Sequence, residues 1–284
     1  MNATFSFEVF PPKSPKADAA LKTTLKHLAP CGPAFWSVTD GAGGSAKAAT
    51  LGTAERIAAL TGDEVAAHLT AINRTPDDIA DRLNDLRMAG VRRIVALRGD
   101  VPSDGEIEDN SLGSSVALIN EINRTRAFEI LAACYPEPHP DSAGLAADMA
   151  HLRRKQEAGA SKLITQFCFE TDKILRYRDQ LARHGIDLPL IPGIMPIKRF
   201  SRIKQFSARC GATIPLWLER AFAGVDETSP VHAMVAAGIA ADQCRRLIAE
   251  GMDHLHIYCL NDAALTEALA RLLPIKQTAG TIAA

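Results

Sequence analysis

The sequence contains no apolar run approaching the roughly 20 residues of a membrane-spanning helix, so a transmembrane protein is not expected. Charge of one sign is not in excess either, because 32 lysines and arginines stand against 33 acidic residues. This balance gives no reason to expect nucleic acid or an anionic membrane as a partner. The chain also starts without the basic and apolar segments of a secretory leader, which predicts a cytoplasmic protein.

No two cysteines have C-x-x-C spacing, which argues against a redox motif or a zinc site. The six cysteines are scattered and several lie in apolar runs, so buried free thiols are expected rather than disulfides. His254 and His256 alternate along one stretch but have no acidic or sulfur companions, and no bound metal is therefore expected.

The sequence does contain a regular alternation of short apolar stretches and helical segments along its 284 residues. The apolar run within 91–97 is typical of a strand buried on both faces, and other stretches repeat the pattern. Strands are expected at 4–9, 34–38, 65–69, 91–97, 130–134, 162–165, 188–194 and 255–258. Helices are expected at 18–28, 46–60, 75–88, 115–123, 145–158, 172–184 and 263–272, with a longer, mainly helical insert over 201–250.

Eight strands separated by helices predict an α/β fold of the (β/α)8 TIM-barrel type, because parallel neighbours need a helical crossover each time. Residues 1–276 are predicted to form this single catalytic domain, and residues 277–284 a flexible C-terminal tail. A doubly wound open sheet is the alternative. It would more often use fewer strands and carry G-x-G-x-x-G after the first one, whereas Gly41-Ala42-Gly43-Gly44 follows the second and lacks that spacing.

Polar residues follow the carboxyl ends of the expected strands, where barrel enzymes build their active sites. The stretch from Val91 to Asp100 organises this pattern, because a buried strand there ends abruptly on Arg98-Gly99-Asp100. A closed barrel would gather at one rim Glu8, Thr39, His68, Arg98, Asp100, Tyr135, His139 and Gln166. This convergence predicts an enzyme.

Glu8 is the first candidate catalytic group. It stands among Phe5, Phe7, Val9 and Phe10, where burial should raise the pKa of its carboxyl group. A glutamate that holds its proton near neutral pH is what general acid catalysis requires. The less specific interpretation is a solvated acid at a strand end.

Other candidates also have plainer interpretations. Asp100 could simply pair with Arg98, and His68 could be a hydrogen-bonded core imidazole. Lys155, with Arg153 and Arg154 before it, could form a solvated helix face or bind a phosphate, which suits both arginine and lysine. Gln166 could bind an amide-bearing heterocycle or cap a neighbouring loop.

Taken together, the motifs resemble those of the flavin-dependent methylenetetrahydrofolate reductases. The resemblance rests, in chain order, on Ser6-Phe7-Glu8-Val9-Phe10-Pro11-Pro12-Lys13, Ser37-Val38-Thr39, Ala67-His68-Leu69-Thr70, Ala96-Leu97-Arg98-Gly99-Asp100, Tyr135-Pro136-Glu137 with His139-Pro140, Ile164-Thr165-Gln166-Phe167 and Pro192-Gly193-Ile194. It covers nearly the whole chain and matches the bacterial form, a catalytic barrel alone.

The resemblance implies an oxidoreductase acting on a CH–NH group in one-carbon metabolism. Such a flavoprotein passes hydride by a ping-pong mechanism from NADH or NADPH through FAD to 5,10-methylenetetrahydrofolate. The product, 5-methyltetrahydrofolate, supplies methyl groups for methionine, and the reaction can also run in reverse. The small-molecule substrates are the implied partners, with no nucleic acid and no membrane, and a homo-oligomer is expected because the family is often oligomeric. The sequence leaves open the choice of NADH or NADPH.

The resemblance also implies residue roles. Glu8 would protonate the bridging folate nitrogen, and Asp100 would lie near the flavin and the pterin. Gln166 would bind the pterin and Phe200 would pack in the substrate cleft. The implied FAD contacts are Thr39, Ala42, His68, Arg98, Gly99, Asp100, Tyr135, His139, Asp148, His151, Arg154 and Lys155.

The chain departs from the family pattern in three places. Asp40 replaces an aromatic or small polar residue and would bring an extra carboxylate near the flavin or nicotinamide. Asp262 stands where some relatives carry an arginine for the folate tail, and the loop at 102–112 lacks an aromatic residue for the adenine.

Two rival functions remain. One is a barrel that binds a flavin or folate without turning it over, which the intact set of Glu8, Asp100 and Gln166 argues against. The other is a different flavin oxidoreductase on the same barrel, such as a proline dehydrogenase-like enzyme.

Overall fold

The computed structural model describes residues 3–40, 46–101, 107–108, 110–138 and 142–273. Within these residues, nine strands form one sheet in the order β7-β6-β5-β4-β3-β2-β1-β9-β8. The strands are β1 (Thr4–Val9), β2 (Trp36–Val38), β3 (Val65–Thr70), β4 (Arg93–Leu97), β5 (Glu129–Cys134), β6 (Lys162–Thr165), β7 (Leu190–Ile191), β8 (Gly193–Ile194) and β9 (His254–Tyr258). All neighbouring strands pair in parallel.

The expected single strand over 188–194 is wrong in one respect, because it is divided at Pro192 into β7 and β8. Proline has no N–H to give to a ladder. The two short pieces pair with different neighbours, β7 with β6 and β8 with β9. Since they are consecutive in the chain, β7 and β8 together occupy one strand position of an eight-stranded barrel and close it between β6 and β9. The expected (β/α)8 TIM barrel is thus confirmed as the fold.

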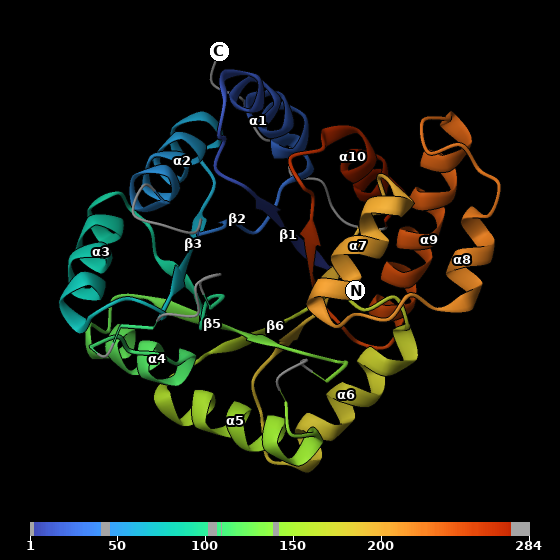
Figure 1. The fold of residues 1–284 in the computed structure, drawn as a ribbon. Helices are drawn as coiled ribbons and strands as arrows, with labels where there is room; N and C mark the ends of the chain where they lie inside the picture. The colour runs from blue at the N-terminus through green and yellow to red at the C-terminus, as the bar shows by residue number, and fades with distance from the viewer. Residues whose placement is uncertain (1–2, 41–45, 102–106, 109, 139–141, 274–284) are drawn as a thin grey trace.

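Helices surround the strands as an outer ring (Figure 1). They are α1 (Pro15–Leu28), α2 (Ala46–Thr61), α3 (Pro76–Met88), α4 (Ser115–Arg124), α5 (Leu145–Ala158), α6 (Thr171–Arg183), α7 (Phe200–Cys210), α8 (Leu216–Phe222), α9 (Pro230–Ala249) and α10 (Ala263–Leu272). The expected helical insert consists of α7, α8 and α9, which lie together on one side of the ring in Figure 1.

Local sequence signals fix several helix ends. Thr75 caps α3 and accepts a hydrogen bond from the backbone of Asp78, whose side chain accepts one back from the N–H of Thr75. Gly159 ends α5 with φ of 116°, a conformation that favours glycine. These two ends agree with the sequence signals and set the directions in which α3 and α5 return to the sheet.

The buried side chains form three groups, because successive strand residues point to opposite faces of the sheet. The largest group packs between strands and helices and includes Phe5, Phe7 and Val9 of β1. A second, around Phe167, joins the insert to the barrel. The third fills the barrel interior with Phe35, Ala66, Val95, Leu131, Ile164 and Ile191. The opposite face of β1, with Thr4, Ser6 and Glu8, therefore points inward.

Candidate active site

The predicted site residues that follow different strands meet at one rim, because every strand runs in the same direction. Glu8 lies near the carboxyl end of β1, and Arg98-Gly99-Asp100 directly follows β4. Tyr135 follows β5 and Gln166 follows β6. Parallel strands thus bring together residues that are far apart in the sequence.

The Glu8 carboxyl group is held between two imidazoles. Its Oε2 atom lies 3.3 Å from Nε2 of His68 and 3.3 Å from Nε2 of His256. Burial alone would raise the pKa of Glu8, but the hydrogen bonds and charge of His256 and His68 outweigh it and lower the pKa to about 2. The expected raised pKa is therefore wrong for this structure: Glu8 is ionised, and any proton it gives must first reach it.

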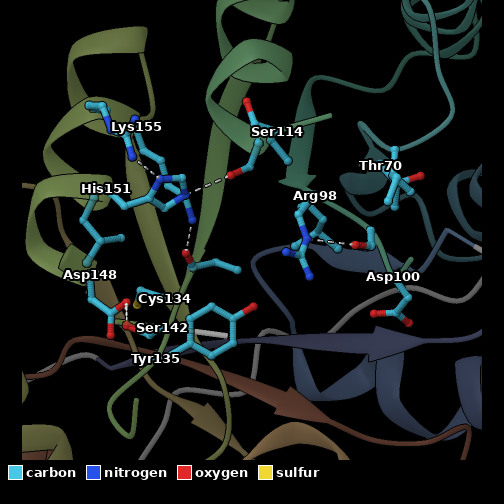
Figure 2. Close-up of a pocket in the computed structure, with 18 of the residues that line it drawn as sticks. Thr70, Arg98, Asp100, Ser114, Cys134, Tyr135, Ser142, Asp148, His151 and Lys155 are labelled. Carbon is cyan, nitrogen blue, oxygen red and sulfur yellow. Dashed lines mark hydrogen bonds between the residues drawn. The ribbon is translucent and has the colours of Figure 1, made fainter. Parts of the chain in front are cut away.

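A cavity of about 1090 Å³ opens beside this rim, at the upper end of the size that binds small molecules and cofactors. Figure 2 shows Arg98 and Asp100 on one side and His151 and Lys155 across from them. Eight predicted cofactor residues line it: Arg98, Gly99, Asp100, Tyr135, Asp148, His151, Arg154 and Lys155.

The Arg98-Gly99-Asp100 turn requires its glycine. Gly99 has φ of +88°, and a Cβ atom there would lie 2.8 Å from Cγ2 of Ile72. Arg98 and Asp100 are exposed to the cavity on either side. The backbone therefore turns tightly against β3 and presents one cation and one carboxylate to the same space.

Helix α5 forms the opposite wall. Lys155 is buried and its Nζ donates to the carbonyl oxygen of Ala133 at 2.8 Å, and burial lowers its pKa to about 8. Burial and the charges of Lys155 and Arg154 lower the pKa of His151 to about 4, so this imidazole is neutral near pH 7. Asp148 accepts a hydrogen bond of 2.5 Å from Oγ of Ser142. Arg153 turns away and donates to the carbonyl oxygen of His184.

The donor set of the cavity suits a phosphate-bearing cofactor. Ser114 and Ser115 line it at the first turn of α4, and a helix N-terminus attracts anions. Nε of Arg74, which also lines the cavity, is buried without a hydrogen-bond partner among the described residues. Together with Arg98, Arg154 and Lys155, these groups could hold a pyrophosphate.

Besides Glu8, four described residues of the predicted site are not part of this cavity lining. His68 is buried beside Glu8, with Nε2 2.6 Å from Oγ of Ser37. Thr39 directly follows β2, and the side-chain oxygen of Gln166 accepts from the N–H of Phe167 at 3.0 Å. Phe200 is buried against Phe222, with ring centroids 4.9 Å apart. The predicted contacts Ala42 and His139, and the predicted tail at 277–284, lie outside the described residues.

The two acidic departures have structural partners. Asp40 pairs with Arg82 at 2.9 Å and accepts a hydrogen bond from Oγ1 of Thr70. Asp262 caps α10 by accepting from the N–H of Leu265 at 3.2 Å, and it also pairs with Lys198. Each carboxylate is thus engaged with a cation of the chain itself.

Sequence reasoning missed His256 and Tyr258 at the site. Tyr258 pairs with Glu8 in register, and its hydroxyl donates to the carbonyl oxygen of Thr165 at 2.7 Å. The ring has room because residue 193 is glycine, where a Cβ atom would lie 2.6 Å from it. The alternation His254-x-His256-x-Tyr258 beside Thr4-x-Ser6-x-Glu8 was the available signal, since both rows face inward.

Over the described ranges, no group of three or more His, Cys, Asp and Glu side chains is placed to hold a metal ion. The six cysteines are free, and all but Cys210 are buried. No helix in the described part of the chain is long and apolar enough to cross a membrane.

Comparison with known proteins gives a consistent result. The sequence model of the methylenetetrahydrofolate reductase family matches residues 1–273. The 5,10-methylenetetrahydrofolate reductase of Escherichia coli is 36% identical over 271 residues, covering 95% of this chain and 90% of that protein. Methylenetetrahydrofolate reductase (NADH) 1 of Arabidopsis thaliana is 32% identical over 90% of this chain but only 46% of its own length.

A solved structure shares the fold with little sequence identity. It is an uncharacterised protein from Clostridium thermocellum that binds two copies of 5-methyl-5,6,7,8-tetrahydrofolic acid. The TM-score is 0.64 at 11% identity, and the match covers 95% of this chain and 93% of that one. This structural similarity agrees with the barrel fold of this chain.

Proposed function

Because this chain belongs to the methylenetetrahydrofolate reductase family, as its motifs indicated, and is an oxidoreductase of folate one-carbon metabolism, we propose that it passes hydride from NADH or NADPH through FAD to 5,10-methylenetetrahydrofolate. The product is 5-methyltetrahydrofolate. The observation that carries this proposal is the common rim, where Glu8 and Asp100 lie at the carboxyl ends of parallel strands beside a cavity with phosphate-binding groups.

The lining of the cavity fits FAD. When bound, FAD would supply the hydride carrier between the two substrates. Arg98, Arg154 and Lys155 would hold its pyrophosphate, helped by the N-terminus of α4. Tyr135 and Gly99, which line the same cavity, would supply an aromatic ring and a close backbone approach. Thr39, Ala42, His68, His139, Asp148 and His151 are proposed as further contacts.

Glu8 would act as the general acid. An unprotonated amine is a poor leaving group, so the bridging folate nitrogen must gain a proton before the five-membered ring opens to an iminium. A well-placed acid contributes about 10²–10⁴ in rate to such a step. Since Glu8 is ionised between His68 and His256, we infer that one of these imidazoles passes it the proton.

The remaining substrate groups would position and stabilise the folate. The exposed carboxylate of Asp100 would stabilise the cationic iminium, because opposite charges attract strongly in a site that excludes water. Gln166 would hydrogen-bond the pterin, and Phe200 would pack against it. The folate-binding neighbour from Clostridium thermocellum supports a folate substrate at this type of barrel.

The test is the visible spectrum of the purified protein. A yellow solution that NADH or NADPH bleaches would establish the flavin and the first half-reaction. Reoxidation by 5,10-methylenetetrahydrofolate, but not by a proline-type acceptor, would separate this function from a proline dehydrogenase-like enzyme. A colourless protein that cannot take up FAD would contradict the proposal, and a protein that is never reduced would favour a binding barrel.

A further inference from the structure

Two neighbouring strands place a row of polar side chains along the barrel interior. Strands β1 and β9 pair in parallel, with Thr4 opposite His254, Ser6 opposite His256 and Glu8 opposite Tyr258. Alternate residues of a strand point to the same face. The row therefore runs from the amino-terminal rim, opposite the active site, up to Glu8.

Hydrogen-bond distances join this row without a gap. Nε2 of His256 lies 3.3 Å from Oε2 of Glu8, and its Nδ1 lies 2.6 Å from Oγ of Ser6. Oγ of Ser6 lies 3.0 Å from Nε2 of His254. Nδ1 of His254 lies 2.7 Å from Oγ1 of Thr4, which is exposed. We call these five residues, Glu8, His256, Ser6, His254 and Thr4, the barrel row.

One choice of tautomers makes every hydrogen bond in the barrel row point toward Glu8. The Thr4 hydroxyl then donates to Nδ1 of His254, whose Nε2–H donates to Ser6. Ser6 donates to Nδ1 of His256, whose Nε2–H donates to the Glu8 carboxylate. Ser6, His254 and His256 each both donate and accept, which is the arrangement that proton transfer along a chain requires. Thr4 begins the row as a donor, and the Glu8 carboxylate ends it as an acceptor.

We propose that the barrel row conducts protons from water at the amino-terminal rim to Glu8. This proposal rests on the proposed role of Glu8 as the acid. In one transfer, the Nε2–H bond of His256 breaks as an O–H bond forms on Glu8, and the Ser6 proton moves to Nδ1 of His256. His254 replaces the proton of Ser6, Thr4 replaces that of His254, and a hydronium ion at the rim replaces that of Thr4. One proton moves in total, and nothing is oxidised or reduced.

The surroundings favour this route over diffusion of water. Ser6 and His256 are fully buried, and the interior cluster that contains Val95, Leu131 and Ile164 fills the middle of the barrel. The opposite rim would be covered by FAD and folate during the reaction. Glu8 itself is only 9% exposed. A proton supply from the amino-terminal rim would let Glu8 regain its proton while the ligands cover the active-site rim.

His254 is suited to relay rather than to store a proton. Its ring stacks on Phe35, with centroids 5.6 Å apart and planes 7° apart, which fixes its orientation. Burial lowers its pKa to about 3, helped by the positive charges of Lys162 and Arg93, although Glu129 opposes this. A neutral imidazole accepts at one nitrogen and donates at the other, so His254 can pass a proton without holding a charge.

His68, the second imidazole beside Glu8, connects it to buried side chains rather than to the exposed Thr4. His68 contacts Glu8 at 3.3 Å and Ser37 at 2.6 Å, and Ser37 is fully buried. The His68 branch therefore joins Glu8 to the core, whereas the His256 branch reaches the exposed Thr4. This asymmetry assigns the solvent connection to β9.

Ser6→Ala tests the middle of the barrel row. The expected result is a roughly 10-fold or greater slowing of reduced-flavin oxidation by methylenetetrahydrofolate, since general acid catalysis would lose its supply. The solvent deuterium isotope effect on that step should rise, while reduction by NADH should be unchanged. Ser161→Ala is the matched control, because its hydroxyl bonds to the carbonyl oxygen of Ile130 at the same end of the barrel and outside the row.

Thr4→Val tests the entrance with a surface residue of nearly the same shape. It should slow the same step and raise its isotope effect, and Thr4→Ser should restore both. Nitrogen NMR of the histidine rings in the ligand-free protein adds a readout independent of activity. Ser6→Ala should shift the ring nitrogen resonances of both His254 and His256, and Ser161→Ala should not.

The outcomes separate the two proposals. Retention of folate reduction in Glu8→Gln would overturn the role of Glu8 and, with it, the barrel row. If Glu8→Gln is inactive toward folate but Ser6→Ala and Thr4→Val react at the unmodified rate, only the barrel row is overturned. Unshifted histidine resonances in Ser6→Ala would also overturn it.

Discussion

Asp40 and Arg82 form a buried ion pair in which Oδ1 and Nη2 are 2.9 Å apart. The side chain of Asp40 is fully buried, and that of Arg82 is 5% exposed. The negative charge of Asp40, which departs from the family pattern, is therefore balanced by Arg82 within the protein. Its position links α3 to the rim, since Asp40 also binds Thr70 at the end of β3.

Replacing Asp40 with asparagine should destabilise the fold. The change leaves the guanidinium of Arg82 buried without its counter-charge, which typically costs about 3–5 kcal/mol. Denaturant unfolding would measure the loss. Arg271→Met is the control, because Arg271 pairs with Glu267 at an exposed position, and losing that pair should change the free energy of unfolding far less. Equal effects of both substitutions would contradict a stabilising role for the buried pair.

Glu8→Gln should separate the two half-reactions. The amide keeps the shape of the side chain but cannot deliver a proton, so folate reduction should fall by about 10²–10⁴. FAD binding and reduction by NADH should persist. Stopped-flow absorbance of the flavin would follow both steps, and normal rates in both would show that Glu8 is not the acid.

The same substitution predicts a change in how stability depends on pH. The folded-state pKa of Glu8 is about 2, below its ordinary value of 4.5, so the unfolded chain takes up this proton first as the pH falls. The stabilisation is complete above about pH 4.5 and is lost as the pH falls toward about 2. Glu8→Gln should therefore lose about 1–3 kcal/mol at neutral pH and show a flatter profile in that acidic window. Parallel profiles for the two proteins would contradict this prediction.

Gly99→Ala should weaken both the fold and the cofactor site. The new methyl group would meet Ile72 at 2.8 Å in a backbone conformation with φ of +88°. The expected loss is about 2 kcal/mol of stability with weaker FAD binding. Gly62→Ala is the matched control, because Gly62 has φ of +71° but open space around its Cβ position. Thermal unfolding and FAD titration would separate the strain that both share from the contact that only Gly99 has.

Lys155→Met should remove a pH dependence of FAD binding. Since burial lowers the pKa of Lys155 to about 8, its charge is lost as the pH rises through that value, and affinity for a phosphate should fall with it. The substituted protein should bind FAD roughly 10-fold more weakly below that pH and respond less to alkali. Arg154→Met should also weaken binding but keep the alkaline decrease, because Lys155 is still present. An unchanged alkaline decrease in Lys155→Met would exclude this role.

The sequence predicted the barrel because each element carries its own signal, from the apolar run of β4 to the capping residues at Thr75. The sequence also predicted that Glu8 and Asp100 lie at one rim, since the carboxyl ends of parallel strands lie at the same end of the barrel. The predicted rise in the pKa of Glu8 was wrong because this pKa depends on His68 and His256. Strand pairing, rather than the residues next to Glu8 in the sequence, brings these imidazoles close to it. In the sequence, Asp262 was considered only as the replacement of an arginine that binds the folate tail in some relatives. An aspartate before the apolar helix 263–272 is also an N-cap signal.

The break at Pro192 has a consequence for how this molecule opens. Strands β7 and β8 each hold their neighbour through only two paired residues, whereas β1 and β9 share five. Short ladders have low local unfolding free energies, so amide hydrogens on either side of the proline should exchange with solvent before those of β1. The ring is therefore expected to part first at this seam, while β9 stays paired with β1 and the first six strands keep their ladders.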